Sequence, residues 1–262
     1  MKKNNNLLKQ KLEYHYKAFD RSKISPDPLE FLHRYNDACD IEISGILSSV
    51  FAYGNIKQII LILEKVHKLM GKSPYNFIIN FNVDKQKNKF ANLYHRFYSS
   101  NDIISLFLAL QEILLTYGSL KYLFLLYYFE TDKNLKNAIY FFNRNITLVI
   151  NKYSEPTTGT KFMFPDPAKG SACKRLNLFL RWMVRKDELD FGIWEEISPS
   201  KLTIPLDTHI AKISTELKLT TQKIANWKMA EEITQNLKQF DEDDPIKYDF
   251  ALCHIGMRNQ EF

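Results

Sequence analysis

The sequence predicts an all-α fold, and three observations lead to that prediction. The 262 residues include only 8 Gly and 9 Pro, which fall mostly between apolar segments. Within those segments apolar residues recur with the period of a helix, and the alternation typical of strands is not evident. Hydrophobic residues make up 45% of the chain, which is ample for the core of one large domain or two small ones.

The first expected helices are bounded by caps, prolines and glycines. One covers residues 7–19 with an apolar face, and a Ser-Pro-Asp-Pro break leads into a second helix that runs through His33. Asp40 is the expected N-cap of a third helix, which ends near residues 53–55. Residues 56–70 form a fourth, which a glycine ends.

The middle of the chain continues this pattern with short polar interruptions. In order, the sequence predicts a helix through residue 81 that Ser73 caps, a polar connection at 84–89, a long helix from Asn101 or Asp102 to 117, a helix after Ser119, a helix at 135–150 and a loop at 154–160. The two helices on either side of Gly118 are apolar almost all round, as central helices are.

A turn and a lysine follow. Residues 167–172, PAKGSA, predict a turn with unpaired backbone N–H groups at the start of a helix, an arrangement that accepts a phosphate. Lys174 is expected about one turn into that helix. The apolar face of the helix should point inward and its basic side should suit phosphates. That basic side comprises Lys174, Arg175, Arg181, Arg185 and Lys186.

An aspartate precedes the next helix. Pro205 disfavours helical geometry at the residue before it, and Asp207 is a good N-cap for a helix over 208–217. Because the positive end of the helix dipole stabilises an anion, the Asp207 carboxylate should stay ionised. Helices at 227–237 and 245–255 close the chain, the last of them ending at a glycine.

The order of these features resembles the helix-hairpin-helix DNA glycosylases. Lys174 stands where that superfamily has its catalytic lysine, and Asp207 in the segment LDTH matches the aspartate of its V-D-T-H segment. Gly170 matches the first glycine of the hairpin's G-x-G, whereas Ala172 replaces the second. The long Lys-to-Asp connector, with Ile-Pro before the aspartate, is similar to the archaeal 8-oxoguanine glycosylase branch. The segments DPLEFLHRYND, AYGNIKQII, GSACKRLNLFLRWMVR, IPLDTH and DPIKYDFAL are similar to a bacterial family beside that branch.

The resemblance implies a base-excision glycosylase with AP lyase activity on an oxidised purine such as 8-oxoguanine in damaged DNA. Lys174 would attack the sugar as a Schiff-base nucleophile, and Asp207 would assist it. DNA contacts would come from Lys169, Gly170, Ser171, Ala172, Arg175 and His209, and from Tyr53 and Asn55 as a wedge opposite the extruded base. Residues 40–204 would form one helical lobe with the hairpin, residues 1–39 and 205–262 the second, and a cleft would lie between them.

Other interpretations of the same residues stay open. An aspartate before a helix is most often only a cap, and a lysine in a first helical turn is usually solvated. The main alternative to an enzyme is a helical module that holds DNA or RNA without chemistry, and the third is an all-α protein-interaction scaffold. The aromatic candidates for stacking on a base, each more often a core residue, are Phe164, Trp182, Trp194 and Trp227.

Charge and cysteine content limit the binding partners, cofactors and cellular location that we expect. The 36 Lys and Arg outnumber the 30 Asp and Glu, for a net charge of +6 that is compatible with an anionic partner. The three cysteines match no metal or disulfide spacing, so we expect no metal, no iron–sulfur cluster and no other cofactor. The expected protein is a cytoplasmic monomer with no membrane partner, because no apolar run spans a bilayer and no signal peptide is evident.

Overall fold

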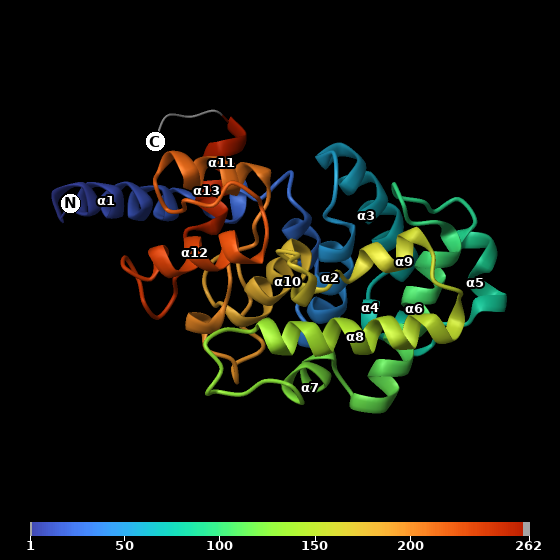
Figure 1. Cartoon of the computed structure of the whole chain (residues 1–262). Helices are drawn as coiled ribbons and strands as arrows, with labels where there is room; N and C mark the ends of the chain where they lie inside the picture. The colour runs from blue at the N-terminus through green and yellow to red at the C-terminus, as the bar shows by residue number, and fades with distance from the viewer. Residues whose placement is uncertain (1, 259–262) are drawn as a thin grey trace. The chain divides into compact units, whose positions relative to one another are not determined.

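The computed structural model describes the backbone of residues 2–258 and the side chains of residues 6–253. Over this range the protein is all-α, as predicted, and no strand forms (Figure 1). Two isolated bridges occur there, between His95 and Tyr98 and between Lys186 and Phe191. None of the helices in this range combines the length and the apolar character that a membrane crossing requires.

The chain folds into two compact units. Unit 1 comprises Met1–Ser25 and Pro167–Phe262, and unit 2 comprises Pro26–Asp166. The sequence instead predicts one lobe at 40–204, whereas the contacts place the unit boundaries after Ser25 and after Asp166. Ion pairs are among the contacts that hold residues 167–204 in unit 1, because Arg181 and Arg185 pair with carboxylates of the C-terminal segment.

Unit 2 is built around a buried helix. Its helices are a 3₁₀-helix at Pro28–Arg34, α2 (Ala38–Phe51), α3 (Ile56–Met70), α4 (Pro74–Ile79), α5 (Val83–Phe90), α6 (Ser100–Tyr117), α7 (Leu120–Leu125), α8 (Lys136–Tyr153) and α9 (Thr158–Met163). Every residue from 40 to 52 is buried, so α2 has no solvent face. The long helices α6 and α8 pack side by side (Figure 1).

Two buried carboxylates of α2 cap other helices. Asp37, not Asp40 as predicted, is the N-cap of α2, and its side chain accepts the N–H of Cys39 at 2.9 Å. Asp40 instead accepts from Ser73 Oγ and from the N–H of Tyr75, at the start of α4. In the same helix Glu42 accepts hydrogen bonds at the start of α7: from Ser119 Oγ at 2.8 Å, from Leu120 N at 2.9 Å and from Lys121 N at 3.2 Å. These buried charges therefore satisfy the donors of two helix ends.

Three further expectations for unit 2 are corrected. The polar stretch at 84–89 is helical, because Asn82 caps it and Phe90 anchors its end in the core. The expected loop at 154–160 already contains the start of α9, where Thr157 and Thr160 form a capping box. Helix α6 is likewise capped by Ser99, which pairs with Asp102 in the same way.

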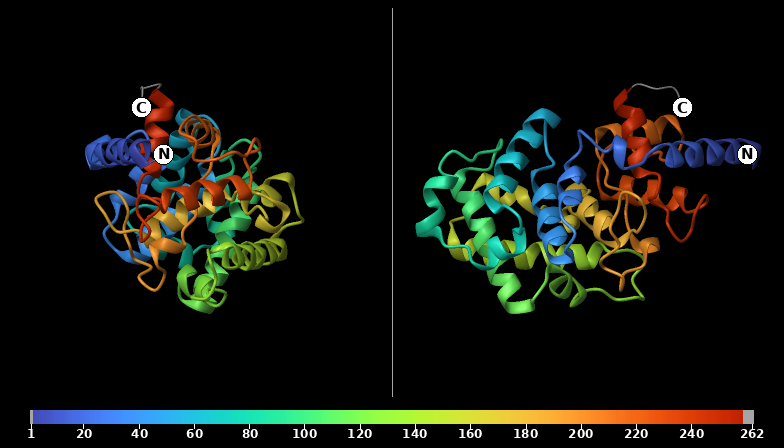
Figure 2. Two further views of the ribbon diagram at one scale, coloured as in Figure 1. Left: turned by 60° about the vertical axis from the view of Figure 1, so that its left-hand side comes forward. Right: turned by 180° about the vertical axis from the view of Figure 1, so that it is seen from behind.

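Unit 1 joins the two ends of the chain. Its helices are α1 (Lys2–Ala18), α10 (Lys174–Val184), α11 (Thr208–Glu216), α12 (Trp227–Leu237) and α13 (Asp249–Arg258), with 3₁₀-helices at Arg21–Lys23, Pro167–Lys169 and Pro199–Lys201. Helix α13 packs against both α1 and α11, and α1 lies beside α13 in both views of Figure 2. Helix α13 starts at Asp249, later than the predicted residue 245, and it continues past Gly256.

Candidate active site

Lys174 and Asp207 form an ion pair within unit 1. Lys174 is the first residue of α10, Asp207 directly precedes α11, and Lys174 Nζ lies 3.1 Å from Asp207 Oδ2. The Lys174 side chain is 37% exposed and that of Asp207 is 16% exposed. The amine is thus reachable from solvent, while the carboxylate is mostly covered. Lys174 does not lie one turn into α10, as the sequence predicts, but is its first residue, because the turn ends only at Cys173.

Asp207 is the N-cap that the sequence predicts. Its Oδ1 accepts the backbone N–H groups of His209 and Ile210, both at 2.9 Å. Burial by itself raises the pKa of Asp207, but the neighbouring Lys174 and the hydrogen bond from Ile210 outweigh burial and lower it below 3.8. The carboxylate is therefore ionised at neutral pH, with one oxygen on the helix and the other on the amine.

The turn before α10 leaves backbone donors unused. Gly170 has a φ of +89°, which favours glycine, and a Cβ there would meet open space. Its carbonyl accepts the N–H of Trp227 at 3.0 Å, which ties the turn to the start of α12. The N–H groups of Ser171 and Ala172 donate no hydrogen bond within the described part of the chain, and α10 has no side-chain cap. Such groups at a helix N-terminus can bind a phosphate oxygen.

The other predicted DNA contacts of unit 1 divide into exposed and buried residues. Lys169 in the turn and His209 in the first turn of α11 are exposed. Arg175 is buried, with 6% of its surface exposed, so its expected place on a basic surface is wrong. The same correction applies to Arg181 and Arg185, at 2% and 3%.

Arg181 and Arg185 instead belong to a buried charge cluster at the end of α10. Arg181 Nη2 lies 3.1 Å from Asp190, and Arg181 Nη1 lies 2.5 Å from Asp249. Arg185 also bonds Asp190. The remaining members of the cluster, both partners of Arg185, are Asp187 at 2.9 Å and Asp244 at 2.8 Å. The sequence pattern of α10 shows that the arginines share a polar face, but it does not show that aspartates outside the helix cover that face. The sequence therefore predicts a solvated face.

Tyr53 and Asn55 lie in unit 2. Asn55 is the N-cap of α3, where its side chain accepts the N–H of Lys57 at 3.0 Å. Tyr53 is half-buried, and the guanidinium of Arg96 lies 4.4 Å from its ring centroid. A Cβ on Gly54, whose φ is +108°, would lie 2.6 Å from Arg96 Nη1, so glycine leaves room for this stacking.

Two further aromatic rings complete this group, which we name the Arg96 cluster. Phe162 lies 4.5 Å from Tyr53 between ring centroids, and Phe97 lies 6.2 Å from it in a stacked orientation. Phe97 is 46% exposed, and Arg96 adopts a left-handed φ of 53° that non-glycine residues rarely take. Neither Arg96 nor Phe97 is among the residues that the sequence predicts for the site, since an isolated His-Arg-Phe run gives no sign that the arginine stacks on Tyr53.

The four aromatic candidates for base stacking are all core residues. Phe164 is 7% exposed, and each of the three tryptophans is at most 1% exposed. Among them, the indole N–H of Trp182 has no hydrogen-bond partner in the described part of the chain. None of these rings presents a face to solvent, so they are not surfaces on which a base could stack in this structure.

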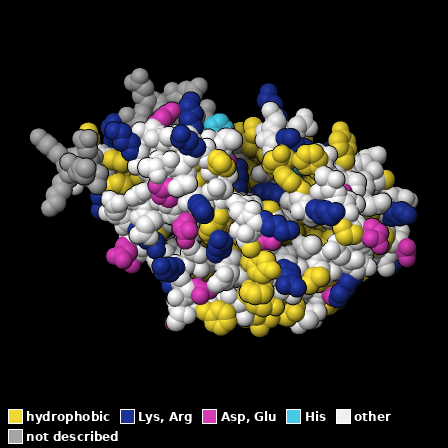
Figure 3. Space-filling view, viewed as in Figure 1, with side chains coloured by type: hydrophobic (Ala, Val, Ile, Leu, Met, Phe, Trp, Pro, Cys, Tyr) yellow, Lys and Arg dark blue, Asp and Glu magenta, His cyan; other side chains and the backbone are white. Residues whose placement is uncertain are grey.

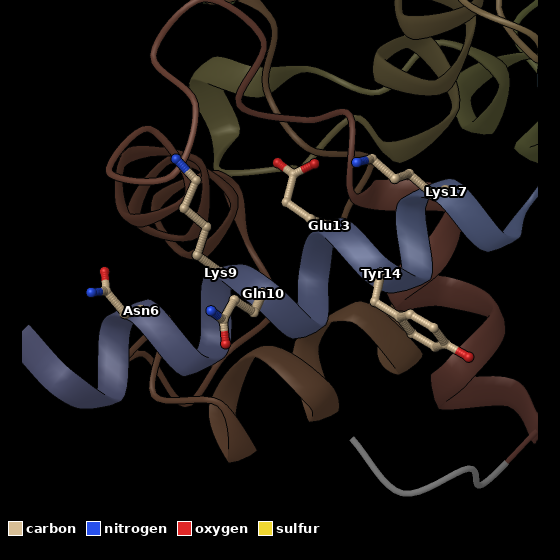
Figure 4. Close-up of a pocket in the computed structure, with 6 residues that line it drawn as sticks. All are labelled: Asn6, Lys9, Gln10, Glu13, Tyr14 and Lys17. Atoms are coloured by element: carbon tan, nitrogen blue, oxygen red, sulfur yellow. The ribbon is translucent and has the colours of Figure 1, made fainter.

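The described residues contain no group of three His, Cys, Asp or Glu side chains that could hold a metal ion. A shallow pocket of about 510 Å³ lies along α1, and Figure 4 shows its six residues on that one helix. Its acid, Glu13, accepts a hydrogen bond from Tyr248 and pairs with Lys247, so it serves the packing of unit 1. Figure 3 shows Lys and Arg side chains spread over the face in view among hydrophobic and acidic ones, without a single basic patch.

Comparison with known proteins gives a family. A family model with the description "Protein of unknown function (DUF2400)" matches residues 27–258. No curated protein and no solved structure matches the chain. The matched range includes Lys174, Asp207 and the Arg96 cluster.

Proposed function

The chain belongs to the DUF2400 family, and we propose that it is a DNA glycosylase with AP lyase activity on an oxidised purine such as 8-oxoguanine. The observation that carries the proposal is the 3.1 Å contact between a partly exposed lysine amine and an ionised aspartate that caps α11. Lysine nucleophiles in enzymes need a neighbouring group that takes their proton and a site that admits the substrate. The Lys174–Asp207 pair supports both, because Asp207 Oδ2 lies beside the amine and the amine is partly exposed.

The reaction uses these two side chains in sequence. Asp207 takes a proton from the Lys174 ammonium, and the neutral amine attacks the anomeric carbon of the sugar. The glycosidic bond breaks, its electron pair leaves with the base, and the base gains a proton from solvent. The Asp207 carboxylate stabilises the positive charge that develops on the sugar before the new C–N bond is complete.

The lyase step follows from the covalent intermediate. The amine then loses its second proton, the C1′–O4′ bond breaks, and O4′ takes a proton and becomes a hydroxyl, which leaves a protonated imine between Lys174 Nζ and the sugar carbon. Loss of a proton from the adjacent carbon then expels the 3′ phosphate, so the strand is nicked without any oxidant or cofactor. Water finally hydrolyses the imine and restores the amine.

The enzyme must also hold a damaged nucleotide outside the stack, because the anomeric carbon is shielded within the duplex. The turn supports this role with the unused N–H groups of Ser171 and Ala172, the uncapped start of α10 and the exposed Lys169. In unit 2, the Arg96 cluster supports a contact with an unpaired base, since exposed aromatic and arginine planes stack on bases.

The alternative is a helical module that binds DNA or RNA without chemistry. It explains the turn and the Arg96 cluster equally well, and it treats Asp207 as a cap only. It does not explain why the second oxygen of that cap contacts a partly exposed lysine. The two proposals differ in one observable, a covalent bond to DNA.

Borohydride trapping tests for that bond. The purified protein is incubated with oligonucleotides that contain 8-oxoguanine, uracil or an abasic site, and the imine is reduced to a permanent crosslink. We expect a crosslink with the 8-oxoguanine strand that maps to Lys174 by peptide mass. Crosslinking to the abasic strand only, at several lysines, would exclude the glycosylase and favour the binding module.

A further inference from the structure

Exposed apolar side chains are concentrated in one part of unit 2. Among the described side chains fourteen large apolar ones are exposed, and eight of these lie between residues 115 and 153. Figure 3 shows hydrophobic side chains gathered over α7 and α8. Six of the eight form what we name the apolar face, and each is between 39% and 68% exposed: Leu115 of α6, Tyr122 of α7, Leu126 and Phe129 after α7, and Phe141 and Leu148 of α8.

This exposure differs from what the sequence predicts. The helices on either side of Gly118, α6 and α7, are apolar almost all round, and such helices are normally buried on every side. Leu115 and Tyr122 nevertheless face solvent, at 68% and 54% exposure. Within one chain, therefore, these helices lack a neighbour on one side.

Bonds between the helices make the apolar face continuous. Glu112 of α6 pairs with Lys152 of α8, and Asn145 of α8 donates to the hydroxyl of Tyr127, just after α7, at 3.1 Å. Leu148 lies between Asn145 and Lys152, at the spacings of three and four residues that place side chains on one face of a helix. This face of α8 therefore borders α7 at one end and α6 at the other.

The area and composition of the apolar face are those of a permanent interface. Its three aromatic rings expose about 300 Å² together, since an aromatic side chain has about 150–250 Å², and the three leucines expose about as much. A total of about 600 Å² is most of the roughly 800 Å² that each partner contributes to a standard interface. Transient interfaces are no more apolar than the rest of a surface, whereas homodimer interfaces are.

The charges around the apolar face favour a protein partner that has the same surface. Glu130 and Lys133 are exposed in the loop between α7 and α8, and Arg144 is exposed on α8 between Phe141 and Leu148. An anionic membrane or a nucleic acid would gain nothing from Glu130, and the leucines offer no ring on which a base stacks. A two-fold interface requires a patch that complements itself, and an apolar centre bordered by charges of both signs does so.

We propose that the apolar face binds a second copy of the chain, so that the protein is a two-fold homodimer in place of the monomer that the sequence predicts. The interface consists of the exposed sides of α7 and α8 and the end of α6. The proposal does not rest on the proposed function, because none of these residues belongs to the Lys174–Asp207 pair, to the turn or to the Arg96 cluster.

Sedimentation equilibrium of the purified full chain tests the proposal, with a matched pair of variants. The wild type should have twice the mass of the chain at micromolar concentration. Leu148→Lys places a charge in the apolar face and should weaken dimerisation about 100-fold or more. Leu61→Lys is the control, because Leu61 has the same 55% exposure on α3 of the same unit but lies outside the face, and this variant should remain a dimer.

The other outcomes overturn the proposal. A wild type that stays a monomer at all concentrations excludes the dimer, and a Leu148→Lys variant that dimerises like wild type excludes this face as the interface. A monomer that cosediments with phosphatidylserine vesicles or binds single-stranded DNA, and loses that binding in Leu148→Lys, assigns the face to a different partner. Both substitutions are at exposed positions, so equal melting temperatures of the dilute proteins show that the fold is intact. Borohydride trapping tests the proposed function separately, and either proposal can fail alone.

Discussion

Asp207 uses its two carboxylate oxygens for different purposes: Oδ1 accepts the N–H groups of His209 and Ile210, and Oδ2 contacts Lys174 Nζ at 3.1 Å. The first set of contacts fixes the side chain on α11, so the second oxygen has a defined position. A cap that is only structural needs the first set alone. The contact with Lys174 is therefore the feature that substitutions should probe.

Lys174→Gln is expected to abolish trapping with the 8-oxoguanine strand. An amide cannot form an imine, whereas its N–H group can still donate to Asp207. Because the pair is partly exposed, the free energy of unfolding should fall by no more than about 1 kcal/mol. The matched control is Lys212→Gln, which removes an exposed lysine from α11 and should leave trapping unchanged. Equal loss in both variants would contradict the assignment.

Asp207→Asn should separate the cap from the chemistry. Asparagine caps a helix about as well as aspartate, so the melting temperature should change little while trapping falls by about 100-fold or more. The pKa of Asp207 is lowered in the folded protein, so its ionised form contributes stability above pH 3.8 that is lost as the pH falls further. The difference in unfolding free energy between wild type and variant should therefore shrink in acid. A variant that melts early yet still forms the crosslink would identify Asp207 as a cap only.

Local rules predicted much of this fold. Helices α3 and α12 have the predicted bounds, because a cap or a glycine marks their ends in the sequence. The start of α11 follows from Asp207 in the same way. Local signals failed where the partner is distant: Asp40 looks like a cap for its own helix, and it serves α4 instead.

The same difference between local signals and distant partners applies to the candidate site. The order of Lys174 and Asp207 could be recognised from the sequence, but the burial of Arg175 and Arg181 could not. A charged residue on an amphipathic helix is normally solvated, and only tertiary partners such as Asp249 stabilise it inside. Arg96 was missed for a similar reason, because its stacking on Tyr53 joins two separate loops.

Gly170→Asp and Gly170→Asn form a matched pair for the turn. Both substitutions place a side chain of the same shape at a φ of +89°, where a Cβ meets open space. They differ by one negative charge beside the proposed phosphate contact. Gly170→Asp should bind undamaged duplex about tenfold more weakly than Gly170→Asn at low salt, in an anisotropy titration. The gap should close as salt is added, and equal affinities at low salt would exclude a phosphate at this turn.

Phe97→Ala tests the Arg96 cluster. Loss of one stacking plane should weaken binding to DNA with an unpaired base by about 1–3 kcal/mol, and should affect fully paired duplex less. Tyr94→Ala is the control, because Tyr94 is another exposed aromatic of the same loop, at 75% exposure, outside the cluster. A similar loss in both variants would indicate general apolar contact rather than stacking at Tyr53 and Arg96.

Asp249→Asn should change how stability depends on pH, with a sign opposite to that of Asp207. The pKa of Asp249 is about 6 in the folded protein and 3.8 ordinarily, so between these values the folded state binds more protons than the unfolded chain. Its contribution to the free energy of unfolding is therefore fully present below pH 3.8 and is lost as the pH rises through 6. The loss amounts to about 3 kcal/mol, on the order of 1.4 kcal/mol per pKa unit.

Asparagine at this position cannot titrate, yet its carbonyl can still accept the hydrogen bond from Arg181. The free energy of unfolding of wild type minus that of the variant, measured with urea from pH 4 to pH 7, should fall by this amount as the pH rises. Asp84→Asn, at an exposed position in unit 2, should show no such slope. A flat difference for Asp249→Asn would mean that Arg181 keeps Asp249 ionised throughout, and the carboxylate would then be a permanent member of the ion pair rather than a group that titrates near pH 6.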